Sequence, residues 1–106
     1  MFKEIDVFEL NEKFKKNQDF LLLDVRNNQE VIISKINNSI HIPMNEIPTR
    51  LNEIDKNKAI IVQCKSGKRS AKVCEFLIQN GYSDVKNLVG GILAWAKHID
   101  DSIIVY

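Results

Sequence analysis

The 106-residue chain is poor in cysteine, proline, glycine and tryptophan, of which it has two, two, four and one. Two cysteines are too few for a disulfide-stapled scaffold, so we expect a reducing compartment. No apolar run approaches the length that crosses a membrane. The first residues include Glu4 and Asp6 and lack the apolar stretch of a secretory signal. The sequence therefore predicts a cytoplasmic protein with no membrane partner.

The chain also lacks an excess of charge of either sign. Its 15 basic and 14 acidic residues give a formal net charge of +1 at pH 7. Nucleic-acid-binding domains usually carry a basic excess, so no nucleic-acid partner is expected. The proportions of hydrophobic residues (44%) and charged residues (27%) are typical of a folded globular protein. A chain of this length has room for one core, so we expect a single domain over residues 1–106.

Short apolar runs alternate with helical patterns, which is typical of a parallel sheet covered by helices. Two runs are almost continuously apolar, as strands buried on both faces are. We expect an α/β fold with a mostly parallel central sheet of about five strands and helices on both faces. Strands are predicted over 20–25, 39–42, 59–63 and 85–89, and helices from Asp6, from Asn27, over 47–54, after residue 70 and over 92–98. The apolar segment 102–106 matches neither pattern.

The chemistry is predicted to lie in the segment that follows the strand over 59–63. In an open parallel sheet, ligands bind outside the carboxyl ends of the strands, and Cys64 stands at such an end. The amides and positive dipole of the helix after it lower the pKa of a nearby thiol. Gly67 allows successive amides to turn toward one anion. Cys64 is therefore the predicted catalytic nucleophile, and the predicted substrate-binding residues are Lys65, Ser66, Gly67, Lys68, Arg69 and Ser70.

Five segments resemble, in the same order, the motifs of the single-domain rhodanese family of thiosulfate-type sulfurtransferases. They extend from Phe20 to Trp95. The segments are Leu22-Leu23-Asp24-Val25-Arg26 with Glu30, His41-Ile42-Pro43, Cys64-Lys65-Ser66-Gly67-Lys68-Arg69-Ser70-Ala71, Asn80-Gly81-Tyr82 and Gly90-Gly91-Ile92-Leu93-Ala94-Trp95.

The resemblance implies a sheet between two layers of helices and a persulfide on Cys64. The implied donor is thiosulfate or a persulfide protein, and the implied acceptor is cyanide, a thiol or a partner protein. No metal or organic cofactor is expected. One segment departs from the family, which has a glycine-containing turn where this chain has residues 34–40. Asparagine also adopts left-handed conformations, so we expect a reshaped turn within the same fold.

Two other functions stay open at this point. The spacing from Cys64 to Arg69 is C-x4-R, one residue shorter than the loop of cysteine-dependent phosphatases and arsenate reductases, so that function is the less favoured one. A sulfur-relay or interaction module that acts with a partner protein is the closer alternative. The absence of a histidine near Cys64 in the sequence argues against a protease, which needs a general base.

Several other residues are assigned structural roles. Cys74 falls on the apolar face of the helix after residue 70, and Trp95 fits a core position better than a substrate platform. Asp24 and Arg26 follow a strand that should neighbour the strand of Cys64, so we expect a supporting ion pair there. His41 and His98 do not combine with the two cysteines in any zinc-ligand spacing, so no metal site is expected.

Overall fold

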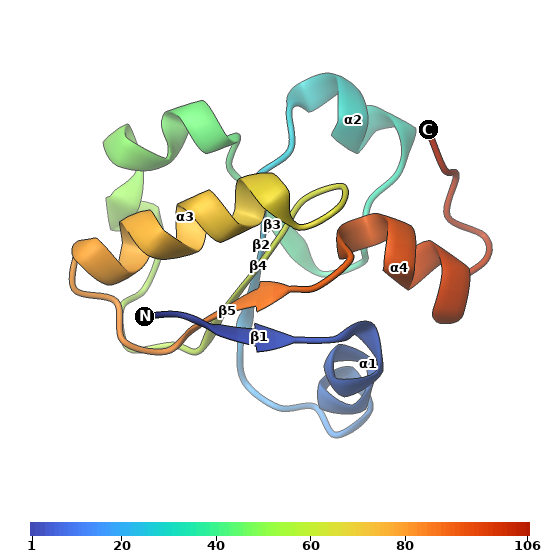
Figure 1. Cartoon of the computed structure of the whole chain (residues 1–106), viewed down its shortest axis with the longest axis horizontal. Coiled ribbons are helices and arrows are strands. Elements are labelled where there is room, and N and C mark those ends of the chain that lie inside the picture. Colours follow the sequence, from blue (N-terminus) through green and yellow to red (C-terminus); the bar gives the residue numbers. More distant parts are fainter.

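The computed structural model describes all residues, 1–106, and contains one five-stranded sheet (Figure 1). Its order is β1-β5-β4-β2-β3, and every neighbouring pair is parallel. The carboxyl ends of all the strands therefore meet at one edge of the sheet. The elements are β1 (Lys3–Ile5), α1 (Val7–Lys15), β2 (Leu21–Asp24), α2 (Asn28–Ile33), β3 (Ser39–His41), β4 (Ile60–Gln63), α3 (Lys68–Gln79), β5 (Val85–Leu88) and α4 (Gly91–His98), with two 3-10 helices between β3 and β4.

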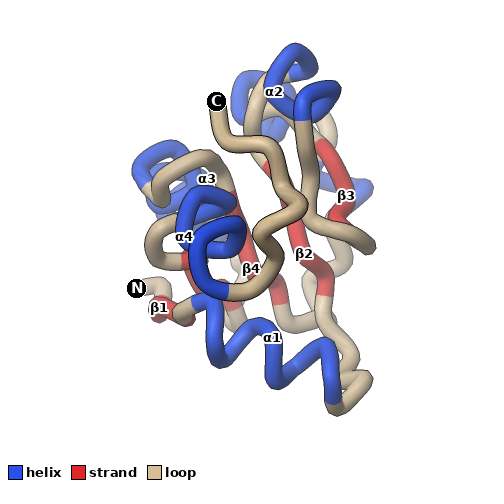
Figure 2. The backbone as a smooth tube through the Cα atoms, turned by 90° about the vertical axis from the view of Figure 1, so that its right-hand side faces the viewer, coloured by secondary structure: helices blue, strands red, loops and turns tan.

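Helices cover both faces of the sheet, as predicted (Figures 1 and 2). On one face, Leu23 and Val62 belong to a buried cluster with Cys74 and Leu77 of α3. On the other face, a second buried cluster contains strand residues together with α1 and α4 residues, among them Leu22, Ile61, Leu10, Ile92 and Trp95. Adjacent strand residues point to opposite faces, so a strand buried on both sides must be apolar throughout. The predicted α/β fold is confirmed.

Capping residues start the first two helices where the sequence predicts. Asp6 accepts a hydrogen bond from the Glu9 amide at 2.8 Å, and Asn27 accepts one from the Glu30 amide at 3.0 Å. In both cases the glutamate side chain bonds back to the amide of the cap, which completes a capping box. The second box also fixes the position of Glu30 at the start of α2.

The prediction of a single helix over 47–54 is wrong. The chain forms two 3-10 helices there, η1 (Met44–Thr49) and η2 (Leu51–Glu53). Pro48 lies inside η1, where it has no amide hydrogen to donate and its ring blocks the regular α-helical turn. Ile47 and Ile54 are nevertheless buried, at 1% and 3% exposure. The apolar spacing therefore identified the buried side chains but not the kind of helix.

The turn that departs from the family pattern uses asparagine in place of glycine. Asn38 has φ 67°, in the left-handed region that asparagine tolerates better than most residues. The chain then enters β3 at Ser39 and pairs with β2. The fold is retained across this segment, as expected, because β3 still pairs with β2.

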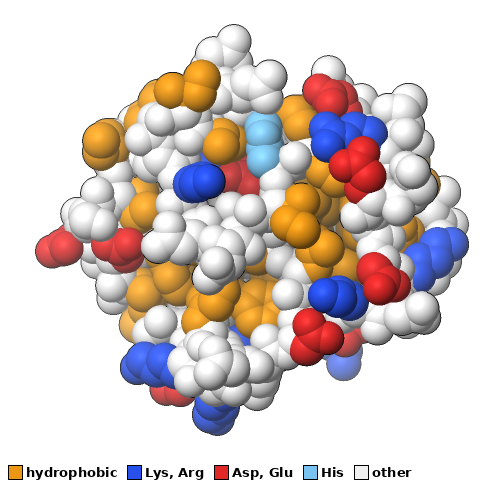
Figure 3. Space-filling model, turned by 180° about the vertical axis from the view of Figure 1, so that it is seen from behind, with side chains coloured by type: hydrophobic (Ala, Val, Ile, Leu, Met, Phe, Trp, Pro, Cys, Tyr) orange, Lys and Arg blue, Asp and Glu red, His pale blue; other side chains and the backbone are white.

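Charged side chains of both signs are scattered over the face seen in Figure 3, between patches of apolar side chains. This mixture fits the formal net charge of +1. No helix of the protein has the length and apolar character to cross a membrane.

Candidate active site

Cys64 lies directly after β4, in the loop that leads into α3. Its side chain is 1% exposed, and its Sγ accepts hydrogen bonds from the amides of Gly67 at 3.1 Å and Ser70 at 3.4 Å. The Ser70 hydroxyl oxygen is 3.3 Å from the same sulfur. Gly67 has φ +109°, which residues with a side chain rarely adopt, and this conformation turns the loop around the sulfur. The loop therefore surrounds Sγ with hydrogen-bond donors.

The helix after the loop starts earlier than the sequence suggests. α3 begins at Lys68, with Gly67 as its N-cap, so Lys68, Arg69 and Ser70 form its first turn. The free amide of Ser70 in this turn donates to the Cys64 sulfur. The loop between β4 and α3 is therefore confined to residues 64–67.

The two cysteines have different acidities. Burial raises the pKa of the Cys64 thiol, but its contact with the Ser70 side chain and the hydrogen bonds from the amides of Ser70, Gly67 and Ser66 outweigh burial and lower that pKa below the ordinary value. Cys74 is fully buried in the core, as expected, and burial raises its pKa to about 12. Of the two thiols, Cys64 is therefore the one that ionises more readily.

An asparagine that the sequence analysis did not single out holds the loop on one side. Asn87 lies in β5, is 5% exposed, and donates from Nδ2 to the Gly67 carbonyl at 3.1 Å. The Ser70 hydroxyl donates to Asn87 Oδ1 at 2.5 Å. Its position within the predicted strand 85–89 could have indicated this role, because the amide of a buried asparagine needs hydrogen-bond partners.

The start of α4 holds the loop on another side. The amides of Ile92 and Leu93 donate to the carbonyls of Cys64 at 2.9 Å and Lys65 at 3.2 Å. Gly91 permits this approach, since a Cβ at that position would collide with the same two carbonyl groups. With its carbonyls bound to α4, the loop keeps its amides free to face the sulfur.

The three predicted loop cations differ in their surroundings. Arg69 forms a two-pronged ion pair with Glu30, with Nη1 to Oε1 at 2.5 Å and Nη2 to Oε2 at 2.8 Å. This pairing holds the pKa of Glu30 at about 2. Lys65 places its ammonium 4.4 Å from the centre of the Tyr106 ring. Lys68 and Ser66 are exposed. Glu30 entered the sequence analysis only as part of a motif, and its pairing with Arg69 was not anticipated.

Asp24 and Arg26 form the expected ion pair, and both side chains are fully buried. Arg26 Nη2 donates to Asp24 Oδ2 at 2.7 Å and to the Ser34 carbonyl at 2.7 Å. His41 Nε2 lies 2.6 Å from the Arg26 carbonyl oxygen. The pair thus joins the end of β2 to the end of α2, and neither residue contacts the Cys64 sulfur.

The segment 102–106, which the sequence analysis could not place, runs from α4 back toward α2 (Figure 2). The Tyr106 hydroxyl donates to Glu30 Oε2 at 2.6 Å and accepts a hydrogen bond from Arg26 Nη1 at 3.0 Å. The Ser34 hydroxyl donates to the Ile104 carbonyl at 3.0 Å. No local residue pattern predicts these contacts, because they join positions 70 or more residues apart.

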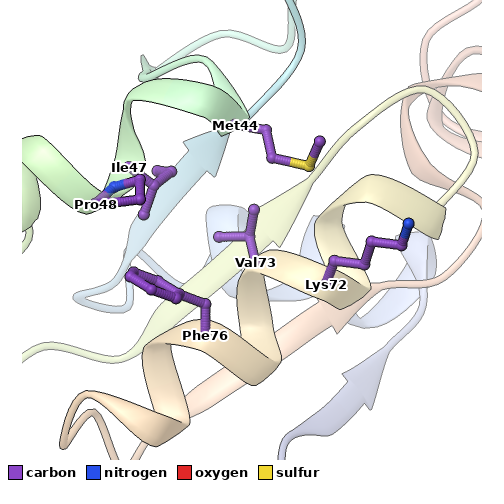
Figure 4. Close-up of a pocket in the computed structure, with 6 residues that line it drawn as sticks. All are labelled: Met44, Ile47, Pro48, Lys72, Val73 and Phe76. Carbon is purple, nitrogen blue, oxygen red and sulfur yellow. The ribbon is translucent and has the colours of Figure 1, made fainter.

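Two surface pockets adjoin the loop on the side of β3 and α3. One, of about 310 Å³, is lined by Val25, Asn27, Pro43, Met44, Asn45 and Arg69. The other, of about 180 Å³, is lined by Met44, Ile47, Pro48, Lys72, Val73 and Phe76. Figure 4 shows this second pocket between η1 and α3, with Met44 and Lys72 at the end nearer the start of α3. Met44 lines both pockets, so the two lie next to each other, and the one between η1 and α3 is the more apolar.

Comparison with known proteins agrees with this arrangement. The model of the rhodanese-like domain family matches residues 7–98. A sulfurtransferase of Allochromatium vinosum is 41% identical over 98 residues, which cover 92% of each chain. A putative sulfurtransferase of Bacillus subtilis, YtwF, is 39% identical over 93 residues, or 88% of this chain and 89% of that one. The crystal structure of a rhodanese-like domain protein from Staphylococcus aureus superposes with a TM-score of 0.84, at 39% identity over 89% of this chain and 91% of that one.

These findings support sulfurtransferase chemistry, since two of the named relatives are described as sulfurtransferases and cover nearly the whole chain. The chain belongs to the rhodanese-like domain family.

Proposed function

We propose that the chain is a single-domain sulfurtransferase that carries a sulfane sulfur as a persulfide on Cys64. The donor is thiosulfate or a persulfide, and the acceptor is cyanide, a thiol or a partner protein. The observation that carries the proposal is the position of Cys64 Sγ among the amides of Gly67 and Ser70, at the end of a central strand. These donors stabilise both a thiolate and a persulfide anion.

The reaction divides into two transfers at Cys64. The thiolate attacks the outer sulfur of thiosulfate and forms a new sulfur–sulfur bond. The sulfur–sulfur bond of thiosulfate breaks, and sulfite leaves with the electron pair. A nucleophilic acceptor such as cyanide then attacks the outer sulfur of the persulfide, thiocyanate leaves, and the electron pair returns to Cys64 as a thiolate. Two moderate barriers thus replace one high barrier.

Neither transfer needs a general base if Cys64 is already ionised. The donors that lower the pKa of the Cys64 thiol favour this ionised form. Lys65 and Lys68 attract the anionic donor, because the charge of Arg69 is matched by Glu30. Asp24 and Arg26 support the site from the end of β2.

The Arg69–Glu30 pair weighs against phosphatase activity. A phosphatase loop uses its arginine to bind two phosphate oxygens, and in this chain both terminal nitrogens of Arg69 bind Glu30 instead. The shorter C-x4-R spacing points the same way.

A relay module that exchanges sulfur with a partner protein is the second candidate. One relative is a putative sulfur carrier protein of Bacillus subtilis, YrkF, 32% identical over 92 residues that cover 87% of this chain and 50% of that one. The apolar pocket between η1 and α3 adds a surface on which part of a partner protein would pack. A relay would accept sulfur from a persulfidated protein faster than from thiosulfate.

Intact-mass measurement tests the proposal. Thiosulfate should add one sulfur, about 32 Da, as a covalent thiol intermediate, and cyanide should remove it. Cys64→Ser should abolish the adduct, and Cys74→Ser should leave it, because Cys74 is buried and its pKa is about 12. An adduct formed only from a persulfidated protein would support the relay. Absence of an adduct with either donor, or its loss in Cys74→Ser alone, would overturn the proposal.

A further inference from the structure

Tyr106 lies against the candidate site although it is 42 positions from Cys64 in the numbering. Its hydroxyl makes two hydrogen bonds, one to Glu30 and one from Arg26. Its ring lies 4.4 Å from the Lys65 ammonium, measured to the ring centre. Tyr106 thus contacts Glu30, Arg26 and Lys65, the last of which belongs to the Cys64 loop.

The orientation of the Tyr106 ring is fixed by groups outside the loop. Glu30 is held by its capping box and by Arg69, and Arg26 is buried in its ion pair with Asp24. The segment is further held where Ser34 donates to the Ile104 carbonyl, and Ile103 and Tyr106 pack against the core cluster beside α4. The ring is therefore a fixed surface on which the flexible Lys65 side chain rests.

Of the three cations, Lys65 is the one that the Tyr106 ring contacts and keeps available to bind an anion. Arg69 is neutralised by Glu30, and Lys68 is exposed. An ammonium on the face of an aromatic ring is attracted by the ring and still has N–H groups that can bind an anion. Holding the side chain there in advance reduces the rotamer entropy that is lost when the anion binds.

We propose that Tyr106 is a positioning residue of the anion-binding site: its ring holds the Lys65 ammonium beside the Cys64 loop, where the ammonium attracts anionic reactants. The inference deepens the proposed sulfurtransferase function, because thiosulfate and low-molecular-weight persulfides are anions. The hydroxyl of Tyr106 serves this role indirectly, through the two hydrogen bonds that orient the ring.

The test compares two reagents that alkylate the same thiolate, iodoacetate and iodoacetamide. Only iodoacetate is an anion, so the ratio of their rates reports the attraction of the site for negative charge, whatever the pKa of Cys64. Tyr106→Leu removes the ring, and we expect it to lower the ratio by about threefold or more. Lys65→Gln should lower it as much, and the double variant should lower it no further than Lys65→Gln does.

Two controls separate positioning from a general disturbance. Val105→Ala alters an exposed neighbour in the same segment, and it should leave the ratio unchanged. Tyr82→Phe removes a hydroxyl that donates to the carbonyls of Leu51 and Ile54, away from the loop, and should also leave the ratio unchanged. Tyr106→Phe keeps the ring and should retain most of the ratio. An unchanged ratio in Tyr106→Leu would overturn the inference. A raised ratio would also overturn it, because it would mean that the ring shields Lys65 from the anion.

Turnover of thiosulfate gives a second readout. In Tyr106→Leu the KM for thiosulfate should rise by a similar factor, while kcat changes less, since the ring acts on donor attraction. If the wild-type protein transfers no sulfur from any donor, the proposed function fails. The alkylation ratio still decides the role of Tyr106 in that case.

Discussion

Glu30 connects three parts of the site. Its backbone and carboxylate complete the cap of α2, its two oxygens bind Arg69, and Oε2 also accepts the Tyr106 hydroxyl. A carboxylate with that many donors is strongly favoured in its charged form, and its pKa falls to about 2. Its charge state therefore links the folding of α2 to the loop of Cys64.

Protonation of Glu30 should reduce the stability of the protein. The pKa in the folded state is about 2, against 4.5 as the ordinary value. The stabilisation is therefore fully present above pH 4.5 and is lost as the pH falls toward 2. Glu30→Gln should lower the free energy of unfolding at pH 7 by about 2 kcal/mol. Urea unfolding at a series of pH values measures this, and the gap between variant and wild type should close at low pH. If the difference in free energy of unfolding stayed constant from pH 7 to low pH, the lowered pKa of Glu30 would be contradicted.

At the scale of elements, the site depends on how closely α4 approaches the loop after β4. The first amides of α4 bind the carbonyls of Cys64 and Lys65, and Gly91 leaves the space for them. Asn87 of β5 binds the other end of the loop at Gly67. The loop conformation is thus imposed by neighbouring elements as well as by the glycine within it.

Gly91→Ala should damage the site more than the fold. The added methyl group would push the carbonyls of Cys64 and Lys65 away from α4 and move the amides that face the sulfur. We expect sulfur transfer to fall by about tenfold or more. Gly81→Ala is the matched control, because Gly81 also has a positive φ, of +90°, but meets only the flexible end of Lys56. It should lose stability and keep its activity. Equal activity in the two variants would contradict this role for α4.

The elements that the sequence predicts well are those with long apolar patterns or clear caps. β2, β4 and α3 follow from their apolar residues, and α1 and α2 follow from their capping boxes. β1 was missed because only Ile5 of its three residues is buried. The position of Cys64 after a buried strand was also evident from sequence. The contacts of Asn87, Gly91 and Tyr106 were not, because they depend on tertiary proximity that no local pattern encodes.

At the scale of the whole molecule, the buried pair of Asp24 and Arg26 joins three distant parts of the chain. It links the end of β2 to the Ser34 carbonyl after α2 and to Tyr106 in the segment 102–106. Both side chains are fully buried, so the charge of each must be balanced by the charge of the other.

Removing both members of this pair should cost less than the costs of the two single removals added together. Asp24→Ala leaves a buried guanidinium without its carboxylate and should lower the free energy of unfolding by about 3–5 kcal/mol. The double variant with Arg26→Leu should lose clearly less than the sum of the two single variants. Urea unfolding of the four proteins measures both values. Additive losses would show that the two charges do not depend on each other.

The parallel sheet has a further consequence for handling the molecule. Since every strand ends at the same edge, the turns at the opposite edge, such as the exposed residues 55–58 before β4, carry none of the residues assigned to the site. A fluorophore or an affinity peptide attached there would report on or immobilise the protein while leaving the sulfur-handling edge open to reactants.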